Sequence, residues 1–87
     1  MEKHRVSHES VLCRLESKEI DQALLKHVGL AHAINHTLCI NLHLQNEVFE
    51  QQGEEPISQR DWGLLIINSG LACLANVEER EAEHDAR

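Results

Sequence analysis

Two long stretches without Asp, Glu, Lys or Arg constrain the fold of this chain most strongly. They are HVGLAHAINHTLCINLHLQN, residues 27–46, and WGLLIINSGLACLANV, residues 62–77. A helix that spans a membrane needs about 20 predominantly apolar residues. The first stretch contains four His and three Asn residues, and the second is too short. We therefore expect both stretches to be buried in protein and neither to cross a membrane.

A turn signal separates the two stretches. The segment EQQGEEPI combines a glycine, two neighbouring carboxylates and a proline, which is a typical turn composition. Ser58 then precedes an apolar run and is a good helix N-cap, while Asp61 places a carboxylate near the positive end of the helix dipole. These signals predict a turn over residues 53–58 and a helix over about 59–83.

The segment before this turn fits one long helix. Its apolar residues recur at helical spacing and form a single stripe at 100° per residue. The stripe consists of Ile20, Leu24, Val28, Ala31, Ile34, Leu38, Leu42 and Phe49. Ser17 is a good N-cap for this helix, and Gly29 is a point at which it could kink or split. A helix over about 17–52 is predicted.

Residues 37–45 also carry a competing strand pattern. Every second residue there is Leu or Ile, and strict alternation is the usual signal of a half-buried strand. Leu is a better helix former than strand former, and residues 11–15 are the only plausible neighbouring strand. The prediction is therefore helix, with strand as the alternative.

The expected fold class is all-α. Residues 17–83 form a helical hairpin domain, and residues 1–16 form either a short helix starting at Ser7 or Ser10 or a loose segment. Residues 84–87 form a tail. A chain of 87 residues is long enough for one such domain.

The two predicted helices carry more apolar surface than a hairpin can cover. A helix that is apolar around most of its circumference is normally surrounded by other elements. We therefore expect two chains to associate into a homodimeric four-helix bundle, because two-fold association uses one patch twice. The alternative is a monomeric three-helix bundle completed by the N-terminal segment. The interface candidates are Leu38, Leu42, Leu64, Ile67, Leu71 and Leu74.

The chain is acidic, and its carboxylates gather at the C-terminus. Eight basic and fifteen acidic residues give a formal charge of −7, which repels a phosphate backbone and argues against direct nucleic-acid binding. Trp62 and Phe49 are the only aromatic residues, so a stacking platform for single strands is not expected. The C-terminal carboxylates are Glu78, Glu79, Glu81, Glu83 and Asp85. They form either a solvated tail or a docking surface for a basic protein partner.

A row of metal-ligand side chains runs along the first predicted helix. Spacings of four, three and four residues place the row on one helix face. Its members are His32, His36, Cys39 and His43. An i, i+4 His pair can supply half of a zinc site, but the sequence has no HExxH motif and no carboxylate between residues 27 and 46 to orient the rings. These residues are expected to be half-buried and hydrogen-bonded boundary residues at a dimer seam or its flank. Zinc binding and a pH switch are the alternatives, and no other cofactor is predicted.

The sequence does not indicate an enzyme. Cys13, Cys39 and Cys73 are widely spaced, which indicates a reduced, cytoplasmic compartment, and the first ten residues contain no apolar signal segment. No cysteine is accompanied by the base and oxyanion groups that nucleophilic catalysis requires. In size, acidity and helical character the chain resembles the small accessory proteins of bacteria and phages that bind another protein. That resemblance implies an inhibitor, an antiactivator or an adaptor of a protein partner.

Overall fold

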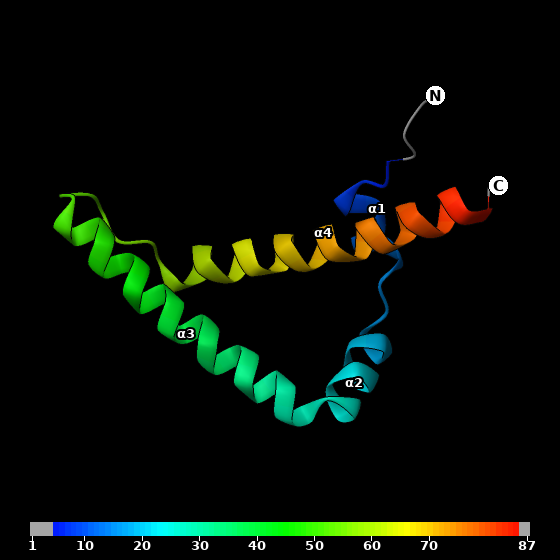
Figure 1. The fold of residues 1–87 in the computed structure, drawn as a ribbon, viewed down its shortest axis with the longest axis horizontal. Helices are drawn as coiled ribbons and strands as arrows, with labels where there is room; N and C mark the ends of the chain where they lie inside the picture. Colours follow the sequence, from blue (N-terminus) through cyan, green and yellow to red (C-terminus); the bar gives the residue numbers. More distant parts are fainter. Residues whose placement is uncertain (1–4, 86–87) are drawn as a thin grey trace. The chain divides into compact units, whose positions relative to one another are not determined.

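The computed structural model describes residues 5–85, and this part of the chain consists of four helices without a strand. They are α1 (His8–Arg14), α2 (Ser17–Lys26), α3 (Val28–Gln51) and α4 (Gln59–Asp85), coloured along the sequence in Figure 1. The predicted all-α fold class is confirmed. Residues 37–45 lie inside α3, so the helical prediction for them is also confirmed.

The chain divides into two compact units, and their boundary lies inside α4 between Gly63 and Leu64. One unit extends from Glu16 to Gly63 and contains α2, α3 and the first residues of α4. The other unit combines the N-terminal segment, up to Leu15, with the rest of α4. This division differs from the hairpin domain predicted over 17–83, because the N-terminal segment packs on the last helix.

Two helices replace the single long helix that was predicted before the turn. The backbone leaves the helical conformation at His27, with φ −128° and ψ 42°, two residues before Gly29. The N-cap of α2 is Glu16, one residue earlier than the predicted Ser17. Glu16 is suitable because its N–H donates to the Glu19 carboxylate at 2.9 Å, as in a capping box.

The end of α3 is closed by a glycine-dependent turn. The N–H of Glu54 donates to the carbonyl of Phe49 at 2.8 Å. The N–H of Gly53 donates to the carbonyl of Glu50 at 3.1 Å. Gly53 has φ 76°, a left-handed conformation that glycine adopts without steric penalty. The two bonds satisfy carbonyls of the last helical turn in the Schellman pattern, which fixes where α3 ends.

The start of α4 is fixed by a side-chain cap and by contacts to α3. Ser58 Oγ accepts the N–H of Asp61 at 3.0 Å, as predicted. The Asn46 amide bonds both backbone groups of Ile57: its Oδ1 accepts the N–H at 2.8 Å and its Nδ2 donates to the carbonyl at 3.2 Å. Trp62 Nε1 donates to the carbonyl of Leu38 at 3.1 Å. These bonds hold residues 57–62 against α3 within one unit.

In the other unit, α1 lies on the C-terminal part of α4 (Figure 1). Ser7 Oγ accepts the N–H of Ser10 at 3.1 Å and caps α1, so the predicted short helix from Ser7 exists. Val11 of α1 and Ala75 of α4 are each 4% exposed, and they are the only buried hydrophobic residues among residues 5–85. Only these two of the described hydrophobic side chains are thus fully enclosed.

Candidate interaction surfaces

The helix α3 presents three different faces, about 120° apart at 100° per residue. The inner face is half-buried and consists of Ala31, Leu38, Leu42 and Phe49. The outer face is exposed and consists of Leu30, Ile34, Thr37, Ile40 and Leu44. The histidine face is also exposed and consists of His32, His36, Cys39 and His43. An apolar face thus remains uncovered after α3 has packed against its own chain.

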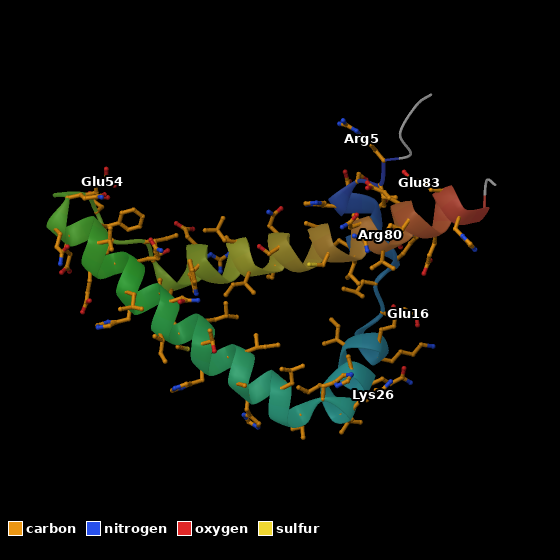
Figure 2. All side chains as sticks on the ribbon, in the orientation of Figure 1. Arg5, Glu16, Lys26, Glu54, Arg80 and Glu83 are labelled. Carbon is orange, nitrogen blue, oxygen red and sulfur yellow. The ribbon has the colours of Figure 1, made fainter. Side chains whose placement is uncertain are left out.

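Exposed apolar side chains extend well beyond α3. Among the described residues, fifteen large hydrophobic side chains are exposed, and they lie on all four helices. Figure 2 shows side chains projecting from α3 and α4 along their whole length. Contiguous exposed apolar surface usually marks a site of interaction with another molecule.

The predicted dimer-interface residues fall into two groups. Leu64, Ile67 and Leu74 on α4 are exposed and available to a second chain. The remaining candidates are half-buried: Leu38 and Leu42 on the inner face of α3, and Leu71 on α4. The outer face of α3 was not among the candidates. Its signal in the sequence was the presence of Ile40 and Leu44, two apolar residues that lie outside the predicted stripe.

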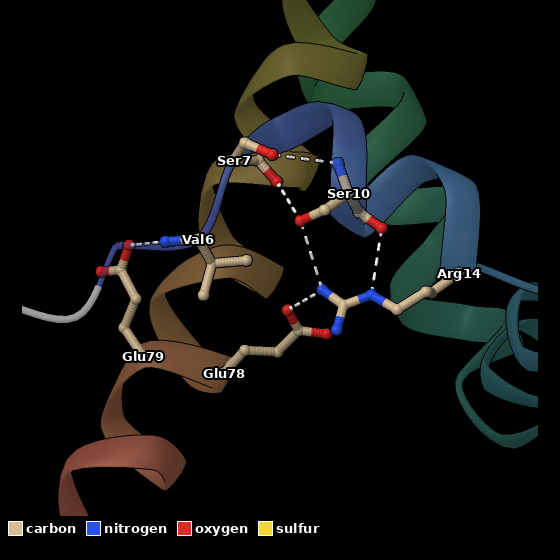
Figure 3. Close-up of polar contacts among 6 residues, drawn as sticks. All are labelled: Val6, Ser7, Ser10, Arg14, Glu78 and Glu79. Carbon is tan, nitrogen blue, oxygen red and sulfur yellow. Dashed lines mark hydrogen bonds and ion pairs between the residues drawn. The ribbon is translucent and has the colours of Figure 1, made fainter.

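The acidic C-terminal candidates are also divided by the structure. Glu78 Oε2 accepts a hydrogen bond from Arg14 Nη2 at 2.6 Å, and Glu79 Oε1 accepts the N–H of Val6 at 2.8 Å (Figure 3). Both glutamates are half-buried. Glu81 and Glu83 remain exposed, and Asp85 has its side chain outside the described part of the chain. The N-terminal segment therefore occupies part of the surface that the sequence suggests for a basic partner.

Sequence reasoning missed the role of Arg14. Its guanidinium is positioned by its own helix, because Nε donates to the carbonyl of Ser10 at 3.0 Å (Figure 3). Two features of the sequence could have indicated this contact. Arg14 is a basic residue at the end of a short segment that begins with a good N-cap, and the C-terminal residues have an excess of carboxylates with which it could pair. The contact shows that this acidic surface accepts an arginine side chain.

The four members of the histidine face are all exposed on α3. His43 Nε2 lies 3.0 Å from Glu47 Oε1, one helical turn further on, so a carboxylate does orient one of the rings. Within residues 5–85, no group of three or more His, Cys, Asp or Glu side chains is arranged to hold a metal ion.

The three cysteines, Cys13, Cys39 and Cys73, are free and exposed. Among the described helices, none combines the length and the apolar character that a membrane span requires.

No protein-family model, curated protein or solved structure matches this chain.

Proposed function

We propose that this chain is a protein-interaction module: a small, acidic, helical and non-enzymatic cytoplasmic protein that acts as an inhibitor, antiactivator or adaptor of a protein partner. In this proposal the chain also associates with a second copy of itself. The observation that carries the proposal is the mismatch between two buried hydrophobic residues and fifteen exposed large ones among the described residues. A stable domain normally buries a contiguous apolar core, so the missing cover is supplied by other protein chains.

The partner proposed for the acidic surface is a basic protein. Glu81 and Glu83 are exposed on α4, next to the turn in which Glu78 already binds Arg14 (Figure 2). Exposed carboxylates at the end of a helix gain little from the helix dipole, which disfavours anions there. Charge complementarity with a basic surface would give them a role in steering and selecting a partner.

Capture from a lysate of the native host, followed by binding measurements with the purified partner, tests this function. The wild type is compared with the double variant Glu81→Gln, Glu83→Gln. The matched control is Glu50→Gln, Glu54→Gln, which removes two exposed carboxylates from the other unit. We expect the wild type and the control to bind a basic protein, and the Glu81, Glu83 variant to bind it at least tenfold more weakly at low salt. Equal affinity of all three, or affinity insensitive to salt, would contradict the docking role.

Zinc binding by the histidine face is the second candidate function. The specific observation in its favour is the contact between His43 and Glu47, because a carboxylate that orients an imidazole ring is typical of zinc sites. Under the main proposal, purified protein contains far less than one zinc ion per chain. Near-stoichiometric zinc, lost together with thermal stability in His36→Ala, would favour the second candidate instead. Metal analysis and a melting curve of both proteins decide between the two.

A further inference from the structure

The outer face of α3 is symmetric about its central residue. Ile lies three residues from Thr37 in both directions, at Ile34 and Ile40. Leu lies seven residues from Thr37 in both directions, at Leu30 and Leu44. A two-fold interface requires that residue i contacts residue j and that j contacts i. An antiparallel pair of α3 helices centred on Thr37 meets this requirement, since Leu30 then faces Leu44 and Ile34 faces Ile40 of the second copy.

We propose that the outer face of α3 (Leu30, Ile34, Thr37, Ile40 and Leu44) is a self-complementary surface that binds a second copy of this chain in an antiparallel orientation. This inference rests on the proposed self-association and names the surface that performs it. The alternative occupants are another protein and the exposed residues of α4.

The side chains needed for such an interface are available on the outer face. Its four apolar members, Leu30, Ile34, Ile40 and Leu44, are each about half exposed. Burial of these side chains against a second copy would remove apolar surface from water and so favour association.

Thr37 does not obstruct a dry contact at the centre of the face. Its hydroxyl donates to the carbonyl of Ala33 at 2.9 Å, so its hydrogen is already bonded within the helix. The methyl group of Thr37 can therefore face a second copy without leaving a buried donor unpaired, which would weaken the association.

Charge favours a second copy at this face and favours the antiparallel orientation. Two chains of charge −7 repel each other, but residues 27–46 contain no Asp, Glu, Lys or Arg. Lys26 lies just before α3 and Glu54 just after it (Figure 2). Glu47 and Glu50 lie in the last turns of the same helix. A parallel pair would bring the acidic ends of both copies together. An antiparallel pair separates the two Glu47 residues by about 30 Å, several Debye lengths at physiological salt.

Two matched variants test which face associates. Leu44→Glu places a charge on the outer face of α3, and Leu74→Glu places one on the exposed face of α4 at a similar exposure, 42% against 50%. We expect Leu44→Glu to raise the dimer dissociation constant about a hundredfold or more, and Leu74→Glu to change it less than threefold, with unchanged helical circular dichroism for both. Dissociation by Leu74→Glu but not by Leu44→Glu would overturn the inference and leave self-association intact. A monomeric wild type would remove the proposed self-association itself.

Thiol cross-linking tests the orientation. The three native cysteines are exposed and are first replaced by Ser. A short bis-maleimide should then join two copies of the Thr37→Cys variant efficiently, because Thr37 lies at the two-fold axis. It should not join two copies of Leu30→Cys, since those positions lie about 21 Å apart along an antiparallel pair. Efficient cross-linking of both variants would indicate a parallel pair, and cross-linking of neither would contradict the assigned surface.

Discussion

Replacing Val11 with Asp is expected to detach α1 from α4. Val11 is 4% exposed and lies between polar contacts on α4 that its neighbours make, those of His8 with Asn68 and of Arg14 with Glu78. A carboxylate at this position would be buried without a partner, at a cost of about 3 kcal/mol or more. The ion pair to Glu78 cannot compensate, because the Arg14 side chain is 59% exposed and pairs of this kind contribute about 0–1 kcal/mol.

Hydrogen exchange of the α1 amides measures this detachment. In the wild type, α1 should be protected, and in Val11→Asp it should exchange at nearly the rate of an unstructured peptide. Leu12→Asp is the matched control. Leu12 is the next residue of α1 and is 55% exposed, so this position should tolerate the charge. Equal protection in the wild type and in Val11→Asp would show that the contact of α1 with α4 does not depend on Val11.

Detachment of α1 from α4 should also strengthen the binding of a basic partner. Glu78 and Glu79 are occupied by Arg14 and by the backbone of Val6 in the folded chain. Release of α1 would expose both carboxylates and enlarge the acidic surface proposed for a basic partner. Val11→Asp should therefore bind such a partner more tightly than Leu12→Asp does.

The parts of this fold that follow from local rules were predictable from the sequence. The cap at Ser58, the glycine turn after α3 and the helical state of residues 37–45 each depend on a few neighbouring residues and on backbone geometry. For residues 37–45, the alternating pattern indicated a strand, but Leu is a better helix former than strand former, and these residues form a helix. The one-residue shift of the α2 cap arose because Glu16 and Glu19 form a capping box that competes with Ser17.

The features that the sequence did not predict all depend on which segments meet. Helical periodicity identifies an apolar face but does not identify what covers it. For this reason the sequence placed Leu38 in the apolar stripe and Leu44 outside it, but it could not show that Leu38 is half-buried and Leu44 exposed. The contact between Arg14 and Glu78 joins residues 64 positions apart, and no local rule reaches that far.

Self-association of the wild type is the second large effect that we expect. The hydrophobic contribution is about 25 cal/mol per Å² of apolar surface removed from water, so burial of the outer face alone favours association strongly before the cost of bringing two chains together. Repulsion between two chains of charge −7 opposes it. Added salt screens this repulsion, and the dimer should therefore become more stable as the salt concentration rises. Docking of a basic partner should show the opposite dependence, because salt weakens attraction between opposite charges.

Sedimentation equilibrium of the purified wild type at low and high salt shows whether two copies of the chain associate. We expect a particle of twice 9.9 kDa at micromolar concentration, with a dissociation constant that falls as salt is added. A particle of 9.9 kDa at every concentration and at both salt levels would contradict it, because the exposed apolar side chains would then have no second copy to cover them.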